Sequence, residues 1–243
     1  DIKNDRNQTL DLQLTSDLSQ TRDQWVNQPL KFLTSAKQAA SSKKVVLTAR
    51  GRVAIASVDG SRLVEIATPL TSRTRKATLS ADNKWVYALN DSSGEMELWQ
   101  YPADGSIGAK QLTFDGNTFR WNIYPSPDGK WLAHDDKNGD LWLLNLDTLK
   151  NRLILSRNNG LSPIGSLSWS HNSQLLAIAR EALGSERSQV MLIDITDDQS
   201  AVLTSEKYAS YSPTFSQDDS WLYFLSDRDF NPYPGAPWGD LNM

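Results

Sequence analysis

Ser126-Pro127-Asp128-Gly129-Lys130-Trp131 is the stretch that decides the fold, because related hexapeptides recur along the chain. They begin at Ser80, Ser170 and Ser216. Successive copies are about 45 residues apart, and a fixed period of this size indicates one supersecondary unit that is repeated. A unit so small cannot bury its own apolar face, so neighbouring units must stack on one another.

Each hexapeptide is a turn between two segments with strand character. Phe119–Ile123 alternates before the central copy, and Trp221–Leu225 is a compact apolar run after the last one. In the central repeat Asn138-Gly139 follows, which is a strong signal for a β-hairpin. Two more strand-like segments, 141–144 and 152–155, complete the repeat. Four antiparallel strands per repeat predict the blades of a β-propeller.

The repeats predict an all-β fold, a β-propeller fragment of about four and a half four-stranded antiparallel blades in an incomplete ring. The first blade lacks the hexapeptide, and its first strand is expected near 29–34. The segment Thr9–Leu14 alternates, so it could pair with the free strand edge near 221–226, and we expect the fragment to associate with itself otherwise. The expected organisation is an N-terminal strand and connector over 1–28, blades over 29–67, 73–113, 119–155, 163–204 and 211–227, and an extended tail over 228–243.

Composition excludes several classes of function. The 243 residues are 39% hydrophobic, with a formal net charge of −4 and no basic block, which argues against nucleic-acid binding. No apolar run approaches the roughly 18 residues of a membrane span, so we expect no membrane partner. Cysteine is absent, which excludes disulfides and thiol chemistry.

Residues at fixed places in the repeat are interpreted as structural. Acidic side chains in the turns should cap backbone N–H groups, and Gly129 tolerates a positive φ. The tryptophans that follow the turns are expected to pack between sheets, with stacking on a ligand as the alternative. Trp238, in a proline-rich tail, is a candidate for docking on another domain. The structural repeat positions are Asp82, Trp85, Asp128, Gly129, Trp131, Asp218 and Trp221.

No catalytic residue or cofactor site is predicted. A hydrolytic triad needs a histidine beside a nucleophile and an acid, and His134 and His171 are the only histidines. His134 falls in a strand, and His171 lies in a turn where Ser170 occupies a repeat position. No Gly-x-Ser-x-Gly sequence is present, and Gly160–Pro163 is interpreted as a loop.

Oxygen-bearing side chains cluster at one hairpin, at Asp135, Asp136, Asn138 and Asp140. Such groups could bind calcium, but the segment lacks the twelve-residue pattern and its closing glutamate. A solvated hairpin is the preferred interpretation. Zinc is not expected, because there is no cysteine and no pair of histidines.

Two segments, 126–131 and Tyr223–Arg228, resemble the TolB-type propeller repeats found in TolB and in several serine peptidases. Among these, the chain most resembles the second propeller of tricorn-type peptidases. The resemblance rests on the tight hairpin Arg50–Ile55 in the first blade and on the long excursion Asp229–Pro234.

The resemblance implies a non-catalytic propeller. The catalytic serine, histidine and acid of that family lie in later domains, and its propellers are expected to steer peptides to, and products from, the catalytic core. Peptides and the protease and PDZ-like domains of the same chain are then the implied partners, in the cytoplasm or alternatively the periplasm. One alternative is a TolB-like module that binds proteins. Another is the propeller cap of a prolyl-oligopeptidase-type hydrolase.

Overall fold

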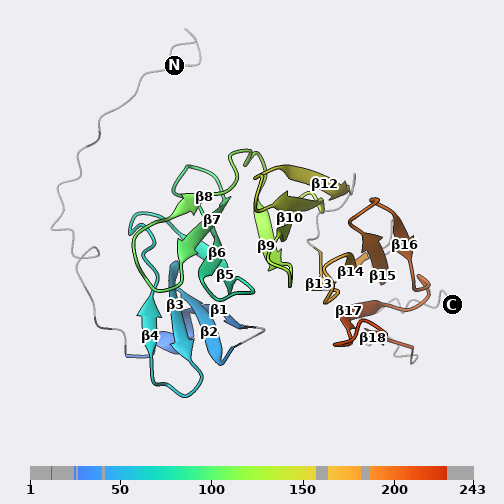
Figure 1. Ribbon diagram of the computed structural model, residues 1–243, viewed down its shortest axis with the longest axis horizontal. Coiled ribbons are helices and arrows are strands. Elements are labelled where there is room, and N and C mark those ends of the chain that lie inside the picture. Colours follow the sequence, from blue (N-terminus) through green and yellow to red (C-terminus); the bar gives the residue numbers. More distant parts are fainter. Residues whose placement is uncertain are drawn as a thin grey trace, which may run out of the picture. The chain divides into compact units, whose positions relative to one another are not determined.

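The computed structural model describes residues 12, 25, 27–39, 42–156, 164–181 and 187–228. The chain separates into two units, residues 1–31 and 32–243, and every described strand lies in the second (Figure 1). A short 3-10 helix, η2 (Pro29–Phe32), precedes the first strand. Within the described part of the chain, no helix is long and apolar enough to cross a membrane.

The described strands form five separate sheets, and within each sheet they pair antiparallel in chain order. We number the sheets blades 1 to 5. Blades 1 to 4 have four strands each, which confirms the predicted fold class, and β18 pairs with β17 in blade 5. Blade 1 comprises β1 (Leu33–Gln38), β2 (Lys44–Ala49), β3 (Arg52–Ser57) and β4 (Leu63–Glu65); blade 2 comprises β5 (Thr74–Leu79), β6 (Trp85–Asn90), β7 (Glu97–Pro102) and β8 (Lys110–Gln111). Blade 3 comprises β9 (Arg120–Pro125), β10 (Trp131–Asp136), β11 (Leu141–Asn145) and β12 (Asn151–Leu155); blade 4 comprises β13 (Ser166–Trp169), β14 (Leu175–Glu181), β15 (Ser188–Asp194) and β16 (Ser200–Val202); blade 5 comprises β17 (Ser210–Phe215) and β18 (Leu222–Ser226).

The hydrophobic core lies between blades rather than within them. Three clusters of buried side chains each join two consecutive sheets: blades 1 and 2, blades 2 and 3, and blades 3 and 4. Val46 packs with Tyr101 in the first cluster, and Leu143 packs with Ile178 in the third. The faces that one blade cannot bury alone are thus buried by the next blade.

The recurrent hexapeptide closes each turn by side-chain capping. In blade 3, the Ser126 hydroxyl donates to Asp128 (2.6 Å), and Asp128 accepts the N–H of Lys130 (3.0 Å). The Ser126 oxygen in turn accepts the N–H of Trp131 (3.0 Å). Blade 2 repeats these contacts with Asp82, blade 4 with Asn172 and blade 5 with Asp218.

The fourth residue of the hexapeptide always has a positive φ. Gly129 has φ 73°, and the other three copies have values between 56° and 60° at Asn83, Ser173 and Asp219. These three side chains also reach the preceding turn. Ser42 donates to Asn83, the N–H of Asp128 donates to Ser173, and the N–H groups of His171 and Asn172 donate to Asp219. Gly129 has no side chain to make this link between blades 2 and 3.

The repeated tryptophans do not share one environment. Trp131 is half-buried against the cluster between blades 3 and 4, with the Arg152 guanidinium over its ring. Trp85 and Trp221 are 36% and 67% exposed, so core packing was the wrong expectation for these two. Arg152 of the outer strand β12 lies over the Trp131 ring, whereas β8 is only two residues long and the described part of blade 5 ends at its second strand. Trp169, by contrast, is buried as expected.

One expected strand is shifted along the sequence, and some expected features cannot be compared with the structure. The first strand of blade 1, expected near 29–34, is Leu33–Gln38, because the 3-10 helix occupies the earlier residues. Several segments singled out in the sequence lie outside the described residues: Thr9–Leu14 (except Leu12), Gly160–Pro163, Asp229–Pro234 and Trp238.

Candidate functional site

The first strand of each blade is the edge strand that contacts the first strand of a neighbouring blade. Direct strand contacts join β1 to β5, β5 to β9, and β13 to β17. Between blades 3 and 4, the indole N–H of Trp169 donates to the carbonyl of Tyr124 (3.0 Å). We call these five edge strands the inner strands (Figure 1).

Polar side chains occupy two repeat positions on every inner strand, two and four residues before the residue that opens the turn. In blade 1 that opening residue is Ala39, whose N–H donates to Lys44 just as that of Ser80 donates to Trp85. These side chains are half-buried in blades 1 to 4 and exposed in blade 5. We call the set the inner-strand face: Ser35, Lys37, Lys76, Thr78, Asn122, Tyr124, Ser166, Ser168, Ser212 and Thr214.

The inner strands differ in charge from the rest of the chain. The whole sequence has 29 acidic and 25 basic residues, yet the five inner strands contain four cations and no acid. Arg120 is neutralised by acidic partners, and Arg75 lies over the Phe119 ring, 5.2 Å from its centroid. Lys37 and Lys76 belong to the inner-strand face itself.

Lys37 reaches from blade 1 to blade 3. Its Nζ donates to the carbonyl of Ile123 (3.3 Å) and lies 5.8 Å from the centroid of the Tyr124 ring. Burial, followed by the positive charge of Lys76, lowers the pKa of Lys37 to about 8, while Asp135 acts in the opposite direction. At neutral pH the ammonium is still mostly protonated.

Asp135 is buried behind this face and anchors two blades. It accepts the backbone N–H and the side-chain amide of Asn122 and the backbone N–H of Ile164, which leads into blade 4. Burial raises its pKa to about 6 against the effect of these donors. Asp136 is also buried and accepts from Asn138, Asp140 and the Trp142 indole.

The expectation of a solvated hairpin was therefore wrong for both carboxylates. Asp135 and Asp136 are only 0% and 2% exposed, and protein donors occupy their oxygens. The hairpin sequence gave no sign of this, because burial depends on Asn122, Thr118 and the approach of blade 4. Within the described residues, no group of three or more acidic or histidine side chains could hold a metal ion.

A polar cluster centred on Arg120 lies between blades 2 and 3. Arg120 is buried and donates to Glu97 (2.9 Å) and Asp115 (2.6 Å), as well as to the carbonyl of Met96. Glu97 also accepts the hydroxyl of Thr113 and the N–H of Gly116. Sequence reasoning missed this cluster, although a lone arginine at the start of an inner strand was a visible signal.

The two histidines have unlike surroundings. His134 is buried, its Nε2 is 3.0 Å from the Asn151 side-chain oxygen, and burial lowers its pKa to about 3. The Asn151 side chain also donates to Asp115, which is a partner of Arg120. His134 is therefore connected through Asn151 to the cluster around Arg120. His171 is in an exposed turn, with Nδ1 3.3 Å from Asp219, while the neighbouring Ser170 hydroxyl donates to Asn172.

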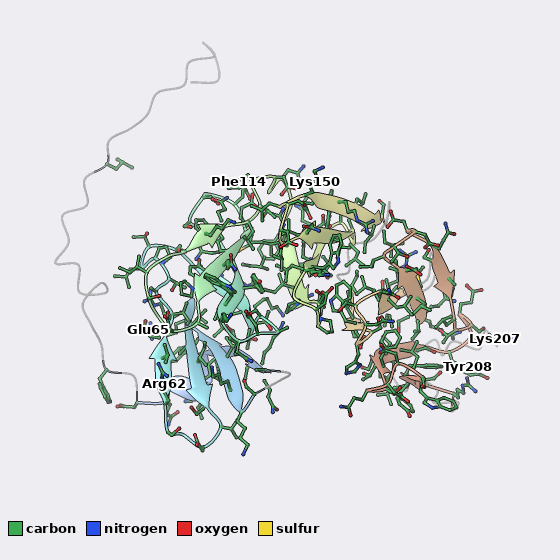
Figure 2. The ribbon with its side chains drawn as sticks, viewed as in Figure 1. Arg62, Glu65, Phe114, Lys150, Lys207 and Tyr208 are labelled. Atoms are coloured by element: carbon green, nitrogen blue, oxygen red, sulfur yellow. The ribbon has the colours of Figure 1, made fainter. Side chains whose placement is uncertain are left out.

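One pocket of about 350 Å³ opens beside blade 5. Its lining includes Lys207, Tyr208 and Arg228, and Figure 2 shows Lys207 and Tyr208 in the loop that leads into β17. The pocket includes Arg228, where the described part of the chain ends. The inner-strand face is the better candidate, because it recurs in all five blades.

Known proteins resemble the chain throughout its length. A tricorn protease from Thermoplasma acidophilum is 22% identical over 90% of the chain and 20% of its own length, and a tricorn protease homolog from Saccharolobus solfataricus is 25% identical over 92% of the chain and 20% of its own length. The crystal structure of the tricorn protease aligns with a TM-score of 0.71 and 19% identity, over 85% of this chain and 20% of that one. TolB from Acinetobacter baumannii aligns with a TM-score of 0.59 and 18% identity, over 75% of this chain and 46% of that one.

These structural likenesses show the fold, and the chain spans between 16% and 25% of the length of the curated relatives it matches. The family model described as the tricorn protease second β-propeller domain matches residues 33–238. The chain therefore belongs to the family of second β-propeller domains of tricorn proteases.

Proposed function

We propose that this propeller is a non-catalytic part of a tricorn-like serine peptidase, where it guides peptides to a catalytic core and products away from it. It would also scaffold the protease and PDZ-like domains of that peptidase. The observation that carries the proposal is the inner-strand face, a double row of hydroxyl, amide and ammonium groups on blades of which the first four are joined by apolar clusters. Hydroxyls and amides both donate and accept hydrogen bonds, so they can meet a peptide backbone whatever its side chains.

The proposal requires the 243-residue chain to bind extended peptides without cleaving them. Binding is measured by fluorescence anisotropy with unstructured labelled peptides, and cleavage by incubation with fluorogenic peptides. We expect saturable binding and no turnover. Turnover that disappears in His171→Ala would contradict the non-catalytic assignment, because His171 is the histidine that solvent reaches.

The TolB-like alternative predicts a different result, since a protein-interaction module should bind a folded partner and should not bind extended peptides. The likeness to TolB shows the fold alone and does not favour this alternative. A prolyl-oligopeptidase-type parent would instead place a hydrolase domain beside the propeller. Cytoplasmic location, the periplasmic alternative and self-association of the chain stay predictions.

A further inference from the structure

Two lysines from neighbouring blades belong to the inner-strand face. Lys37 is on β1 and Lys76 is on β5, two strands in direct contact. Lys37 is held by the Ile123 carbonyl and the Tyr124 ring. An ammonium has three N–H donors, so the bond to Ile123 leaves donors for a ligand.

Lys76 is positioned by an irregularity of the backbone. The register of β5 against β6 shifts between Arg75 and Thr78, and Lys76 has φ 53°. A β-bulge of this kind redirects a side chain, and a left-handed conformation is costly for lysine. Ser212 has the same conformation at the same repeat position of blade 5, where the register of β17 against β18 also shifts, so the irregularity recurs and in blade 2 it carries a cation.

Within the part of the chain that the structure describes, no acidic side chain forms an ion pair within 4.0 Å with either ammonium group. Asp135 is the acid that acts on Lys37, and its oxygens already accept from Asn122 and Ile164. The two lysines are thus a cationic pair without a counter-ion on strands that contain no acid.

We propose that Lys37 and Lys76 bind a carboxylate group of a peptide on the inner-strand face. The inference rests on the proposed peptide-guiding function and adds the chemical group that is recognised. A peptide offers a carboxylate at its C-terminus or on an aspartate or glutamate side chain. The Tyr124 hydroxyl and the Asn122 amide, on the same face, supply neutral hydrogen-bonding groups beside the pair.

The test uses the 243-residue chain and four labelled peptides of one sequence. The first has a free C-terminal carboxylate and no acidic side chain, and the second is its amide. The third and fourth are amides with one internal glutamate or one internal glutamine. We expect the two carboxylate peptides to bind about tenfold more tightly than their neutral partners at low salt, because charge-assisted hydrogen bonds are the strong ones.

Variants then test whether the two lysines cause the preference for carboxylate peptides. Replacing both, Lys37→Met with Lys76→Met, should remove the tenfold preference and leave the binding of the amides unchanged. Lys37→Arg with Lys76→Arg should retain the preference, which excludes a folding defect as its cause. Lys84→Met with Lys110→Met removes the same net charge from outside the inner strands and should change nothing.

Equal binding of all four peptides by the unchanged chain would overturn the carboxylate site and leave peptide guiding in place. A preference that survives Lys37→Met with Lys76→Met would also overturn it. Binding of the free acid but not of the glutamate peptide would assign the site to the peptide terminus. Failure of every peptide to bind would overturn the proposed function together with the site.

Discussion

The junction between blades 2 and 3 is built differently from the junction between blades 3 and 4. Both bury an apolar cluster, but the first adds the buried Arg120–Glu97 ion pair. The second adds a link between turns, from Asp128 to Ser173, and a bond from the Trp169 indole to Tyr124. The absence of a turn link at the first junction follows from one residue, because Gly129 has no side chain with which to reach the turn of blade 2.

The comparison teaches that different interactions can join one blade to the next, provided that the apolar faces between the blades are buried. A buried ion pair depends on both partners, since either ion alone is costly in the interior. A partly buried hydrogen bond between uncharged groups of two turns contributes far less. The two junctions should therefore fail in different ways.

Arg120→Met should be the most damaging change to the first junction. It leaves the Glu97 carboxylate buried without its cation, so we expect a loss of about 3–5 kcal/mol in the free energy of unfolding, measured by urea denaturation. Arg52→Met removes a matched pair with Glu65, which is 65% exposed, and should cost at most about 1 kcal/mol. Equal losses in the two variants would refute the distinction.

Acid should weaken the same junction through His134. Its folded pKa of about 3 is below the ordinary value of 6.5, so the unfolded chain binds more protons as the pH falls below 6.5. Stability should fall by about 1.4 kcal/mol per pH unit from this group. Asp135 has a folded pKa raised to about 6, so its contribution has the opposite sign between pH 6 and 3.8.

The two titrations can be separated by substitution. Asp135→Asn should make the loss of stability between pH 6 and 4 steeper than in the unchanged chain. His134→Gln should make it shallower. Parallel pH profiles for all three chains would show that neither group is coupled to folding.

Trp131→Ala tests the second junction, where the ring packs against the cluster of blades 3 and 4. Because the side chain is only half-buried, we expect a loss of about 2–3 kcal/mol, below the range for a fully buried aromatic residue. Trp221→Ala, at the same repeat position but 67% exposed, should cost less than about 1 kcal/mol. Matching losses would mean that both rings pack alike.

Gly129→Asn would transfer the turn link to the first junction, and its effect should be the smallest. Gly129 has φ 73°, a conformation that asparagine tolerates, and a Cβ there would meet nothing within 4 Å. We expect a change within about 0.5 kcal/mol. A loss above about 2 kcal/mol would show that glycine is required for a reason other than the missing link.

The repeat made the blades predictable from sequence, because the Ser-x-Asp turns cap themselves with their own side chains. Blade 1 lacks that marker at Ala39, which is why its first strand was expected four residues too early. The polar rows of the inner-strand face can be found by counting back from each turn. The contact from Lys37 to Ile123 could not, because it depends on which blades adjoin in space.

The central claim is that peptides meet this propeller on its inner strands. The most direct measurement is photo-crosslinking of an extended peptide that contains benzoylphenylalanine, followed by mass-spectrometric mapping of the attachment sites on the chain. The account predicts attachment to β5 and β9, beside Lys76 and Tyr124, with loss of the crosslinks when unlabelled peptide competes. Competable attachment confined to the outer strands β4, β8 and β12 would contradict it.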